Sequence, residues 1–308
     1  MRIVFFGTPE FAIPSLKMLL QSGEDVIAVV TQIDKRKGRG RIPSPPPVKE
    51  FAMKEGIKIY QPINIQDLLF LKELSDLKPD IIVVVAYGRI LPLQVLNQPS
   101  HGCINVHASL LPKYRGAAPI QWAIIKGEKK TGITTMLMDE GLDTGGILLQ
   151  EETEIIDEDT AETLSKRLSE MGASLLIKTV EGIKKGSLNP IPQRGTPSYA
   201  PPLKKEDGRV DWFKTAQEIF NFVRGTYPWP CAYCYLNRER IKITRVKVLE
   251  GSGMPRRVEK AGEGQLIIGT GNGLISIIEL QPEGKRQMPV TAFLQGRSIR
   301  EGAFLNEP

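Results

Sequence analysis

The sequence predicts an α/β protein in which a mostly parallel β-sheet domain is followed by a smaller β-barrel domain. The chain has 308 residues, and at about 100 to 200 residues per domain this length predicts two domains. In the first part, short β-rich runs alternate with helical patterns, which is typical of βαβ units. Beyond a proline-rich stretch at residues 189–207, short strands recur between Gly-rich turns, which favours a barrel.

The first domain is predicted to span residues 1–188. Near-continuous apolar runs such as Ile81–Ala86 indicate strands that are covered on both faces, and hence a mostly parallel sheet. The predicted strands are Arg2–Phe6, Val26–Thr31, Ile81–Ala86, Gly102–His107 and Ile133–Met138. The predicted helices are Ala12–Gln21, Val48–Glu55, Leu68–Leu77 and Ala117–Lys126, with a longer one from Asp159 or Thr160 to about Lys185.

The stretch at residues 189–207 has five prolines among nineteen residues and no sustained period, so we expect an extended linker there. A second domain is predicted over residues 208–308. Its expected elements are a helix at Thr215–Val223 and strands at Ala232–Leu236, Ile241–Leu249, Gly264–Ile268 and Leu274–Leu280. Short strands at regular spacing favour a small barrel, for which an OB-like fold is one option.

The composition excludes several classes of protein. With 41% hydrophobic and 25% charged residues, the chain is ordinary for a globular protein and not predominantly disordered. The longest uncharged apolar stretch, Ile81–Tyr87, is far shorter than the roughly 20 residues that span a bilayer, so no membrane helix is expected. Arg2 is followed by only four apolar residues before Gly7 and Pro9, which is no signal-peptide core. We therefore expect the protein in the cytoplasm.

The three cysteines do not make a disulfide framework and fit a reducing compartment. Cys231 and Cys234 form a C-x-x-C, but a structural zinc needs two further ligands, and only Cys103, His101 and His107 are available as cysteine or histidine. A metal or redox role is therefore the weaker hypothesis. We expect two small residues in a strand near a turn, and no metal.

The positive charge is concentrated in two places. Residues 1–203 carry 24 Lys+Arg against 23 Asp+Glu, whereas residues 204–308 carry 17 against 12. Within the first part, Lys35–Arg41 (KRKGRGR) holds five basic residues, so the remainder of that part is net negative. This distribution favours a polyanionic partner contacted at two places. The alternative is a solvated charged surface without a partner.

A strand that ends in polar residues is the strongest signal of a site. Side chains alternate along Cys103–Ser109, so Asn105, His107 and Ser109 share one face. Because ligands of open α/β sheets bind beyond the carboxyl ends of the strands, His107 is placed where chemistry is expected. Histidine suits proton transfer at neutral pH, and an amide such as Asn105 can stabilise an oxyanion. Alternatively, a lone histidine can be a structural hydrogen-bonding residue.

Two loops complete this prediction. In Met138–Gly146 (MDEGLDTGG), Asp143 lies between turn glycines, where its carboxylate can contact an imidazole or simply form a local turn. The opening Phe6–Phe11 (FGTPEF) has one of the three glycines of G-x-G-x-x-G, so a nicotinamide or flavin cofactor is not expected. The basic loop Lys35–Arg41 suits contact with a phosphate backbone, which adds affinity without reading bases.

Six stretches of the sequence carry a resemblance to known proteins: INVHASLLPKYRGAAPIQWAI (Ile104–Ile124), MDEGLDTGGIL (Met138–Leu148), FGTPEFA (Phe6–Ala12), TQIDKRKGRGR (Thr31–Arg41), VVVAYGRILP (Val83–Pro92) and RVDW (Arg209–Trp212). Together they resemble the methionyl-tRNA formyltransferase family. The resemblance covers essentially the whole chain. The Asn105, His107, SLLP and Asp143 set is shared by formyl-tetrahydrofolate enzymes of this fold, whereas the basic loop and C-terminal domain point to tRNA.

The resemblance implies a Rossmann-type formyltransferase domain followed by an OB-like barrel that binds tRNA. It also implies that Asn105, His107 and Asp143 are the catalytic residues. The implied folate contacts are Ser109, Leu110, Leu111 and Pro112, with the backbone of Val85, Ala86, Tyr87, Gly88, Arg89 and Ile90. The implied tRNA contacts are Lys35, Arg36, Lys37, Arg39 and Arg41, with Arg39 near the acceptor end.

The implied reaction moves the formyl group of 10-formyltetrahydrofolate to the α-amino group of methionine on initiator tRNA. The expected partners are the folate co-substrate and initiator methionyl-tRNA, with the protein a monomer. One alternative is another folate-dependent formyl transfer or hydrolysis with a small-molecule acceptor. The other is a nucleic-acid-binding module with an inactive enzyme domain, against which the intact set of Asn105, His107 and Asp143 counts.

Overall fold

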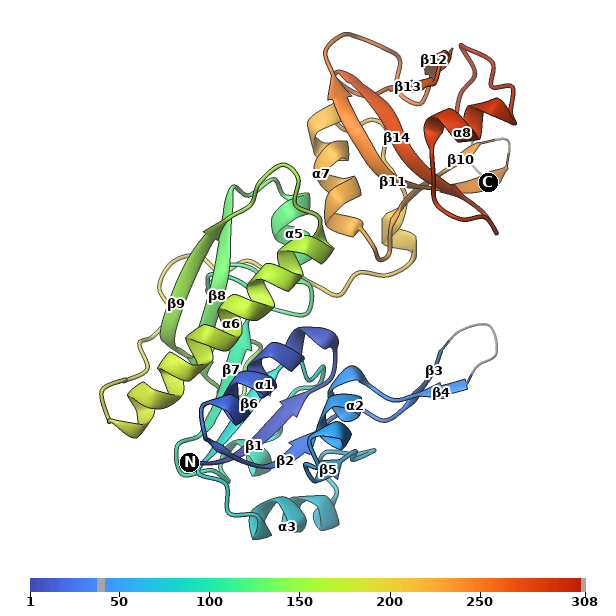
Figure 1. Cartoon of the computed structure of the whole chain (residues 1–308). Helices are drawn as coiled ribbons and strands as arrows, with labels where there is room; N and C mark the ends of the chain where they lie inside the picture. The colour runs from blue at the N-terminus through green and yellow to red at the C-terminus, as the bar shows by residue number, and fades with distance from the viewer. Residues whose placement is uncertain (38–41, 237, 306–308) are drawn as a thin grey trace. The chain divides into compact units, whose positions relative to one another are not determined.

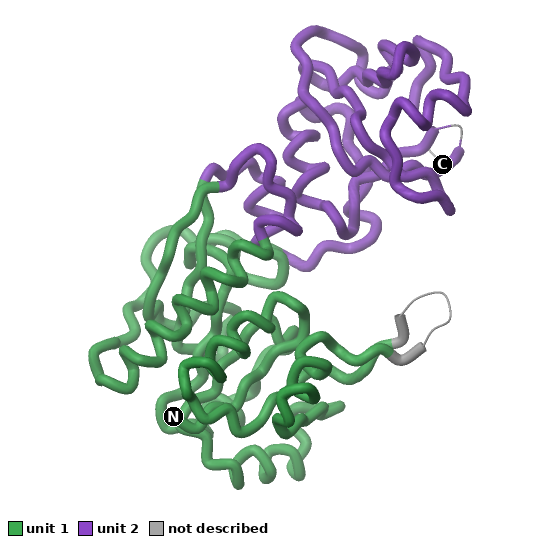
Figure 2. Tube along the Cα trace, viewed as in Figure 1, with its two compact units in different colours: residues 1–119, 130–154, 165–200 green, residues 120–129, 155–164, 201–308 purple. Residues whose placement is uncertain are grey.

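A computed structural model describes residues 1–37, 42–236 and 238–305. The chain divides into two compact units (Figures 1 and 2). Unit 1 comprises Met1–Pro119, Lys130–Glu154 and Ser165–Ala200, and unit 2 comprises Ile120–Lys129, Ile155–Leu164 and Pro201–Pro308. Two short segments from the middle of the chain therefore pack with the C-terminal part.

Unit 1 is built on a seven-stranded sheet with the order β5-β2-β1-β6-β7-β8-β9. Its strands are β1 (Arg2–Gly7), β2 (Asp25–Val30), β5 (Ile59–Tyr60), β6 (Ile81–Val85), β7 (Cys103–His107), β8 (Lys130–Leu137) and β9 (Gly146–Glu154). The strands from β5 to β7 pair in parallel, and only β8 and β9 are antiparallel to their neighbours. The predicted mostly parallel sheet is confirmed.

Helices cover both faces of this sheet, as the apolar runs predict. In β1, Val4 and Phe6 pack into a core that includes Phe70 of a neighbouring helix, while Ile3 and Phe5 on the opposite face are equally buried. Figure 1 shows the two helices α1 and α6 lying over one face. The helices of unit 1 are α1 (Ile13–Gln21), α2 (Pro47–Lys54), α3 (Leu68–Asp76), α4 (Leu93–Leu96) and most of α6 (Ala161–Lys184), with a 3-10 turn η1 (Glu10–Ala12). The start of α6 and nearly all of α5 (Pro119–Ile125) belong to unit 2.

The order of the strands creates a switch point beside β1. From β1 the chain passes to β2 and β5 on one side, and it returns to β6 and β7 on the other. The loops that follow β1 and β6 meet there, since the Thr8 hydroxyl donates to the Tyr87 carbonyl at 3.0 Å. The side-chain amide of Gln32 donates to the same carbonyl at 3.2 Å. Open α/β sheets bind their ligands in the crevice at such a point.

Residues 189–200, which open the predicted linker, form no named helix or strand but are paired along unit 1. Ile191 and Ile147 exchange two main-chain hydrogen bonds of 2.8 Å. Further along, the Arg115 amide donates to the Ser198 carbonyl at 2.8 Å, and the Ala200 amide donates to the Arg115 carbonyl at 2.7 Å. This segment is extended, and it is held against the unit that precedes it.

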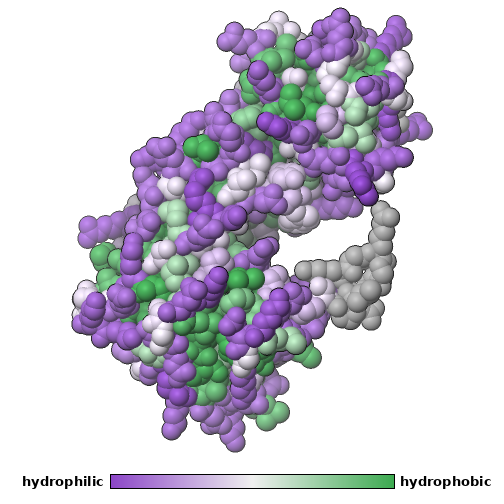
Figure 3. Space-filling view, viewed as in Figure 1, coloured by the Kyte–Doolittle hydropathy of each residue, from purple (hydrophilic) through white to green (hydrophobic). Residues whose placement is uncertain are grey.

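Unit 2 contains an antiparallel sheet with the order β10-β11-β14-β13-β12, to which β15 adds beside β14. Its elements are α7 (Ala216–Thr226), β10 (Ala232–Leu236), β11 (Glu239–Leu249), β12 (Val258–Gly262), β13 (Gln265–Gly269), β14 (Leu274–Pro282), β15 (Met288–Pro289) and α8 (Val290–Gln295), with a 3-10 turn η2 (Glu206–Gly208). Apolar side chains of the strands, α7 and α8 form one core. The predicted C-terminal β domain is confirmed, and its sheet is antiparallel. In Figure 3, hydrophilic residues border a hydrophobic patch on the visible face of this domain.

The basic loop is described only in part. A short hairpin pairs β3 (Lys35–Lys37) with β4 (Ile42–Ser44), and Lys35 is exposed. Arg39 and Arg41 lie outside the described residues, as do the side chains of Arg36 and Lys37. Among the helices that the structure describes, none has the length and apolar character needed to cross a bilayer.

Candidate active site

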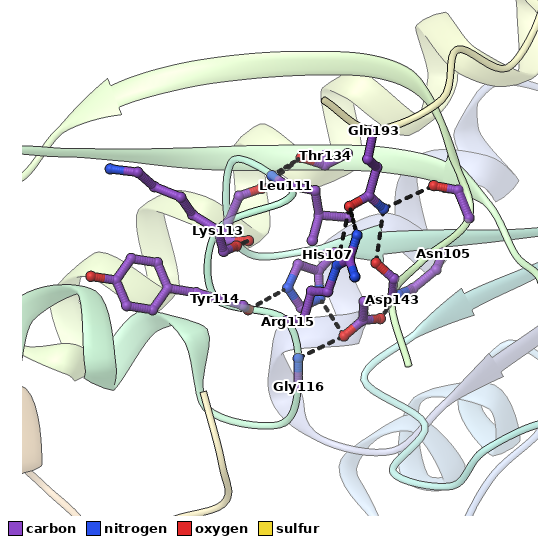
Figure 4. Close-up of polar contacts among 12 residues, drawn as sticks. Asn105, His107, Leu111, Lys113, Tyr114, Arg115, Gly116, Thr134, Asp143 and Gln193 are labelled. Carbon is purple, nitrogen blue, oxygen red and sulfur yellow. Dashed lines mark hydrogen bonds and ion pairs between the residues drawn. The ribbon is translucent and has the colours of Figure 1, made fainter. Parts of the chain in front are cut away.

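The three predicted catalytic residues come together at the carboxyl end of β7 (Figure 4). Asn105 and His107 lie on β7, and Asp143 lies on the loop between β8 and β9. The Asn105 amide donates to Oδ1 of Asp143 at 3.3 Å, and Nδ1 of His107 lies 3.6 Å from Oδ2. The His107 side chain is 6% exposed and that of Asp143 12%. Two strand residues and one loop residue thus form a single, largely buried polar cluster.

The glycine-rich loop has the shape that this contact requires. Asp143 adopts a φ of 51°, in the left-handed region that L-residues rarely occupy. A Cβ on Gly145 would lie 1.9 Å from the Leu137 carbonyl oxygen, so only glycine fits there. At the start of the loop, Asp139 accepts hydrogen bonds from the Gly141 amide at 3.1 Å and the Thr144 hydroxyl at 2.6 Å. These contacts fix the turn that carries Asp143.

The surroundings of His107 define a site for one proton. Its Nε2 lies 2.9 Å from the Tyr114 carbonyl oxygen, which can only accept, so Nε2 carries a hydrogen. A neutral ring then presents its Nδ1 lone pair to the Asp143 carboxylate. The lone pair and the negatively charged carboxylate repel each other. A proton on Nδ1 or on the carboxylate replaces this repulsion by an attraction. The pair can therefore accept one proton and later release it.

Asp143 is anchored by groups that the sequence pattern does not single out. The Gly116 amide donates to Oδ2 of Asp143 at 2.7 Å. The Gln193 side-chain amide donates to the carbonyls of Asp143 and Gly145 at 2.8 and 2.9 Å, and its oxygen accepts from Arg115. Gly116 lies inside the PKYRGAAP segment, where a glycine is a visible signal. Gln193 lies in the proline-rich stretch, and nothing in its sequence context marks it.

The predicted folate residues 109–112 form a braced turn beyond β7. Ser109 is buried and its hydroxyl donates to the Lys113 carbonyl at 2.6 Å. Thr134 of β8 donates to the Ser109 carbonyl at 2.6 Å and accepts from the Leu111 amide at 3.1 Å. Leu111 is also buried, whereas Leu110 and Pro112 are half-buried. The side chains left accessible in this turn are therefore apolar ones.

The other predicted folate segment, residues 85–90, leaves the same edge of the sheet. Because β6 and β7 are parallel, with Val84 opposite Asn105, the loop after β6 begins level with the catalytic cluster. Val85 and Tyr87 are buried, and Tyr87 packs edge-on against Phe6 with ring centroids 5.1 Å apart. The remaining predicted positions Ala86, Gly88 and Ile90 are exposed, and Arg89 is half-buried. Ala86 and Gly88 thus leave main chain accessible in this segment, and Ile90 adds an exposed apolar side chain.

The cysteine pair lies in a different environment. Cys231 precedes β10 and Cys234 lies within it, and both are buried. Burial raises the pKa of the Cys234 thiol to about 12 and also raises that of Cys231. Within residues 1–37, 42–236 and 238–305, no group of three or more His, Cys, Asp or Glu side chains is arranged to hold a metal ion.

Two protein families match this chain. Residues 1–180 match the family described as formyl transferase, and residues 202–298 match the formyl transferase C-terminal domain. Together they cover most of the chain and both compact units.

Solved structures with the same fold include complexes with folate compounds. An N-formyltransferase from Helicobacter canadensis, in complex with folinic acid and dTDP-3-aminofucose, has a TM-score of 0.70 at 22% identity over 92% of this chain and 99% of that one. HypX from Aquifex aeolicus with tetrahydrofolic acid has a TM-score of 0.64 at 18% identity; the match covers 96% of this chain and 47% of HypX, so the chain spans just under half of that protein. At these identities the likeness establishes the fold.

The sequence relatives are much more similar. A methionyl-tRNA formyltransferase from Thermodesulfovibrio yellowstonii is 56% identical over 97% of both chains. One from Pelotomaculum thermopropionicum is 52% identical over 100% of this chain and 99% of the relative. With identity at this level over nearly the full length, and with both formyl transferase domains matched, the chain belongs to the methionyl-tRNA formyltransferase family.

Proposed function

We propose that this protein transfers the formyl group of 10-formyltetrahydrofolate to the α-amino group of methionine on initiator tRNA, and that Asn105, His107 and Asp143 catalyse the transfer. The observation that carries the proposal is the cluster these residues form at the carboxyl end of β7, with His107 Nδ1 3.6 Å from Asp143 Oδ2. It lies at the carboxyl edge of the sheet, where such folds bind substrates.

The reaction joins the methionine nitrogen to the formyl carbon and breaks the bond from that carbon to N10 of the folate. The attacking nitrogen loses a proton, and N10 gains one. A free α-amino group has a pKa of about 7.7 to 8.0, so much of it is protonated at neutral pH and must be deprotonated before it attacks. The enzyme therefore has to remove a proton, stabilise an oxyanion and supply a proton to the leaving nitrogen.

Each of these tasks has a residue suited to it. Asn105 donates a hydrogen bond to the oxyanion of the tetrahedral intermediate, because its amide carries two hydrogens and Asp143 uses only one. His107 takes part in proton transfer and contacts the oxyanion. Asp143 orients the imidazole and relays a proton toward N10. The amine proton is received by His107 or by Asp143, whose Nδ1 and Oδ2 lie 3.6 Å apart.

The substrate contacts follow the sequence prediction. We assign the folate to the turn of residues 109–112 and the loop of residues 85–90, where the exposed Ala86 and Gly88 let a flat ring approach the main chain. We assign the tRNA acceptor end to the loop Lys35–Arg41, with Arg39 as its contact near that end, and further tRNA contacts to the C-terminal domain. We also propose that residues 1–188 and 208–308 are the two domains, and that residues 189–207 link them. A monomer in the cytoplasm is the form in which we expect this activity.

The choice of acceptor tests the proposal. The protein is incubated with 10-formyltetrahydrofolate and either methionine-charged initiator tRNA or glycinamide ribonucleotide, and the formylated product is identified by mass. We expect formyl-methionine on the tRNA and no formylated ribonucleotide. Formylation of the ribonucleotide alone, or release of formate without an acceptor, would replace this proposal by one of the small-molecule alternatives.

A further inference from the structure

Gln193 comes from the proline-rich segment after α6, yet its side chain reaches the catalytic loop (Figure 4). Its Nε2 donates to the carbonyl oxygen of Asp143 at 2.8 Å and to that of Gly145 at 2.9 Å. Both hydrogens of the amide are thereby used on two carbonyls of one turn. A side chain with a single donor hydrogen could not hold both.

Arg115 fixes the orientation of this amide. Its Nη2 and Nε donate to the Gln193 oxygen at 2.6 and 3.2 Å, so the oxygen faces the guanidinium and the NH2 group faces the loop. The main chain of Arg115 is in turn paired with that of Ser198 and Ala200. The next residue, Gly116, donates to the Asp143 carboxylate at 2.7 Å. One short stretch therefore organises both the main chain and the side chain of Asp143.

These contacts hold Asp143 in a conformation that it would otherwise leave. Its φ of 51° costs free energy, and such residues persist only where their surroundings over-determine them. Gly145 gives the turn no side-chain packing of its own. Among the described residues, Gln193 donates the hydrogen bonds that connect the carbonyls of Asp143 and Gly145 to a neighbouring segment.

We infer that Gln193 is a positioning residue for catalysis: it sets the place of the Asp143 carboxylate relative to His107 through the main chain of the turn. The segment of residues 189–200 is then part of the catalytic site as well as a connection to the C-terminal domain. This inference rests on the proposed role of Asp143 in formyl transfer.

Two variants of the full-length protein test it. Gln193→Ala removes the amide, and Gln193→Glu keeps its size and the acceptor for Arg115 but has no hydrogens for the two carbonyls. We expect kcat to fall by about tenfold to a hundredfold in both, as for a catalytic group displaced by a fraction of an ångström to about 1 Å. KM for each substrate should stay within about threefold. Gln98→Ala is the matched control, because the Gln98 amide donates to the Leu71 carbonyl at 3.1 Å away from the site.

The decisive measurement adds Gln193→Ala to Asp143→Ala, in single turnover with excess enzyme. Because Gln193 acts through Asp143, adding Gln193→Ala should slow the Asp143→Ala variant by less than about twofold. Multiplication of the two separate losses in the double variant would overturn the inference, as would a kcat within twofold of normal in Gln193→Glu. Circular dichroism and thermal midpoints check that each variant is folded. Failure of the unaltered protein to formylate methionyl-tRNA would instead overturn the proposed function.

Discussion

The main-chain amide of Gly116 donates a hydrogen bond of 2.7 Å to Oδ2 of Asp143, the carboxylate oxygen that faces His107. A backbone donor cannot rotate away, so it fixes this oxygen more firmly than a side chain would. The contact depends on the conformation of Gly116, whose φ is 117°. A Cβ at this position would also lie 2.8 Å from the Ala200 carbonyl oxygen.

Gly116→Ala is therefore expected to slow formyl transfer by at least about tenfold, because the main chain must shift and withdraw its amide from Asp143. Steady-state formylation of charged initiator tRNA measures the effect. Gly186→Ala is the control: it also has a positive φ, of 64°, but a Cβ there meets nothing within 4 Å. Equal losses of activity in the two variants would show that the hydrogen bond to Asp143 is unimportant.

The cysteines are expected to be unreactive in the folded protein. Burial raises the pKa of both Cys103 and Cys234 to about 12, so at pH 8 only about one thiol in ten thousand is the reactive thiolate. The pKa is raised because burial in the folded protein disfavours the charged thiolate. A thiol-specific disulfide reagent at pH 8 should modify all three cysteines only after denaturant is added. Rapid labelling of Cys231 and Cys234 in the native enzyme would restore a redox role for the C-x-x-C.

Arg224 is expected to be essential to the stability of unit 2. It is 7% exposed and donates to the carbonyls of Ile156 and Asp159, at 2.7 and 3.2 Å, and to the Asn221 side chain. Arg224→Met removes these donors from buried acceptors, at about 1 to 3 kcal/mol for each group left unsatisfied. The midpoint of urea unfolding should fall clearly, and that of the exposed control Arg286→Ala should not. A midpoint unchanged by Arg224→Met would mean that water replaces the guanidinium.

The two basic regions are expected to act differently on tRNA. Removing charge from the exposed residues Arg245 and Lys247 of β11 should weaken binding and lower the slope of log affinity against log salt by about 0.7 to 0.9 for each phosphate that is no longer neutralised. Arg39→Ala should instead damage catalysis by misplacing the acceptor end. Filter binding at several salt concentrations, together with single-turnover formylation, separates the two effects. If neither change altered the salt-dependent affinity for tRNA, the prediction that tRNA contacts two basic regions would be wrong.

Much of the fold could be predicted because buried strands are apolar throughout. The predicted runs Arg2–Phe6 and Ile81–Ala86 match β1 and β6 to within one residue at each end. No strand is predicted from the sequence at β9, because β9 is the last strand of the sheet and its C-terminal half carries Glu151, Glu152 and Glu154. Its alternating pattern of burial is real, but the acidic residues hide it in the sequence. The helix α8 has only six residues, too few for a helical period of apolar residues to be recognised in the sequence.

The catalytic cluster could be predicted in part for a different reason. Strand alternation and the strand end place Asn105 and His107 together, and the Gly-rich loop marks Asp143. The contacts that hold these residues come from main-chain atoms of Tyr114 and Gly116 and from Gln193, which is fifty residues from Asp143 in the sequence. A carbonyl or amide carries no residue-type signal, and a single glutamine among prolines carries little. Such supports appear only when the chain is folded.

We propose that formyl transfer to methionine on tRNA depends on the pair of His107 and Asp143. The most direct measurement is single-turnover formylation of charged initiator tRNA by the unaltered enzyme, His107→Ala and Asp143→Ala, with tRNA affinity measured in parallel. We predict a rate at least about a hundredfold lower in each variant, with affinity for tRNA retained. Turnover close to that of the unaltered enzyme in either variant would contradict the account.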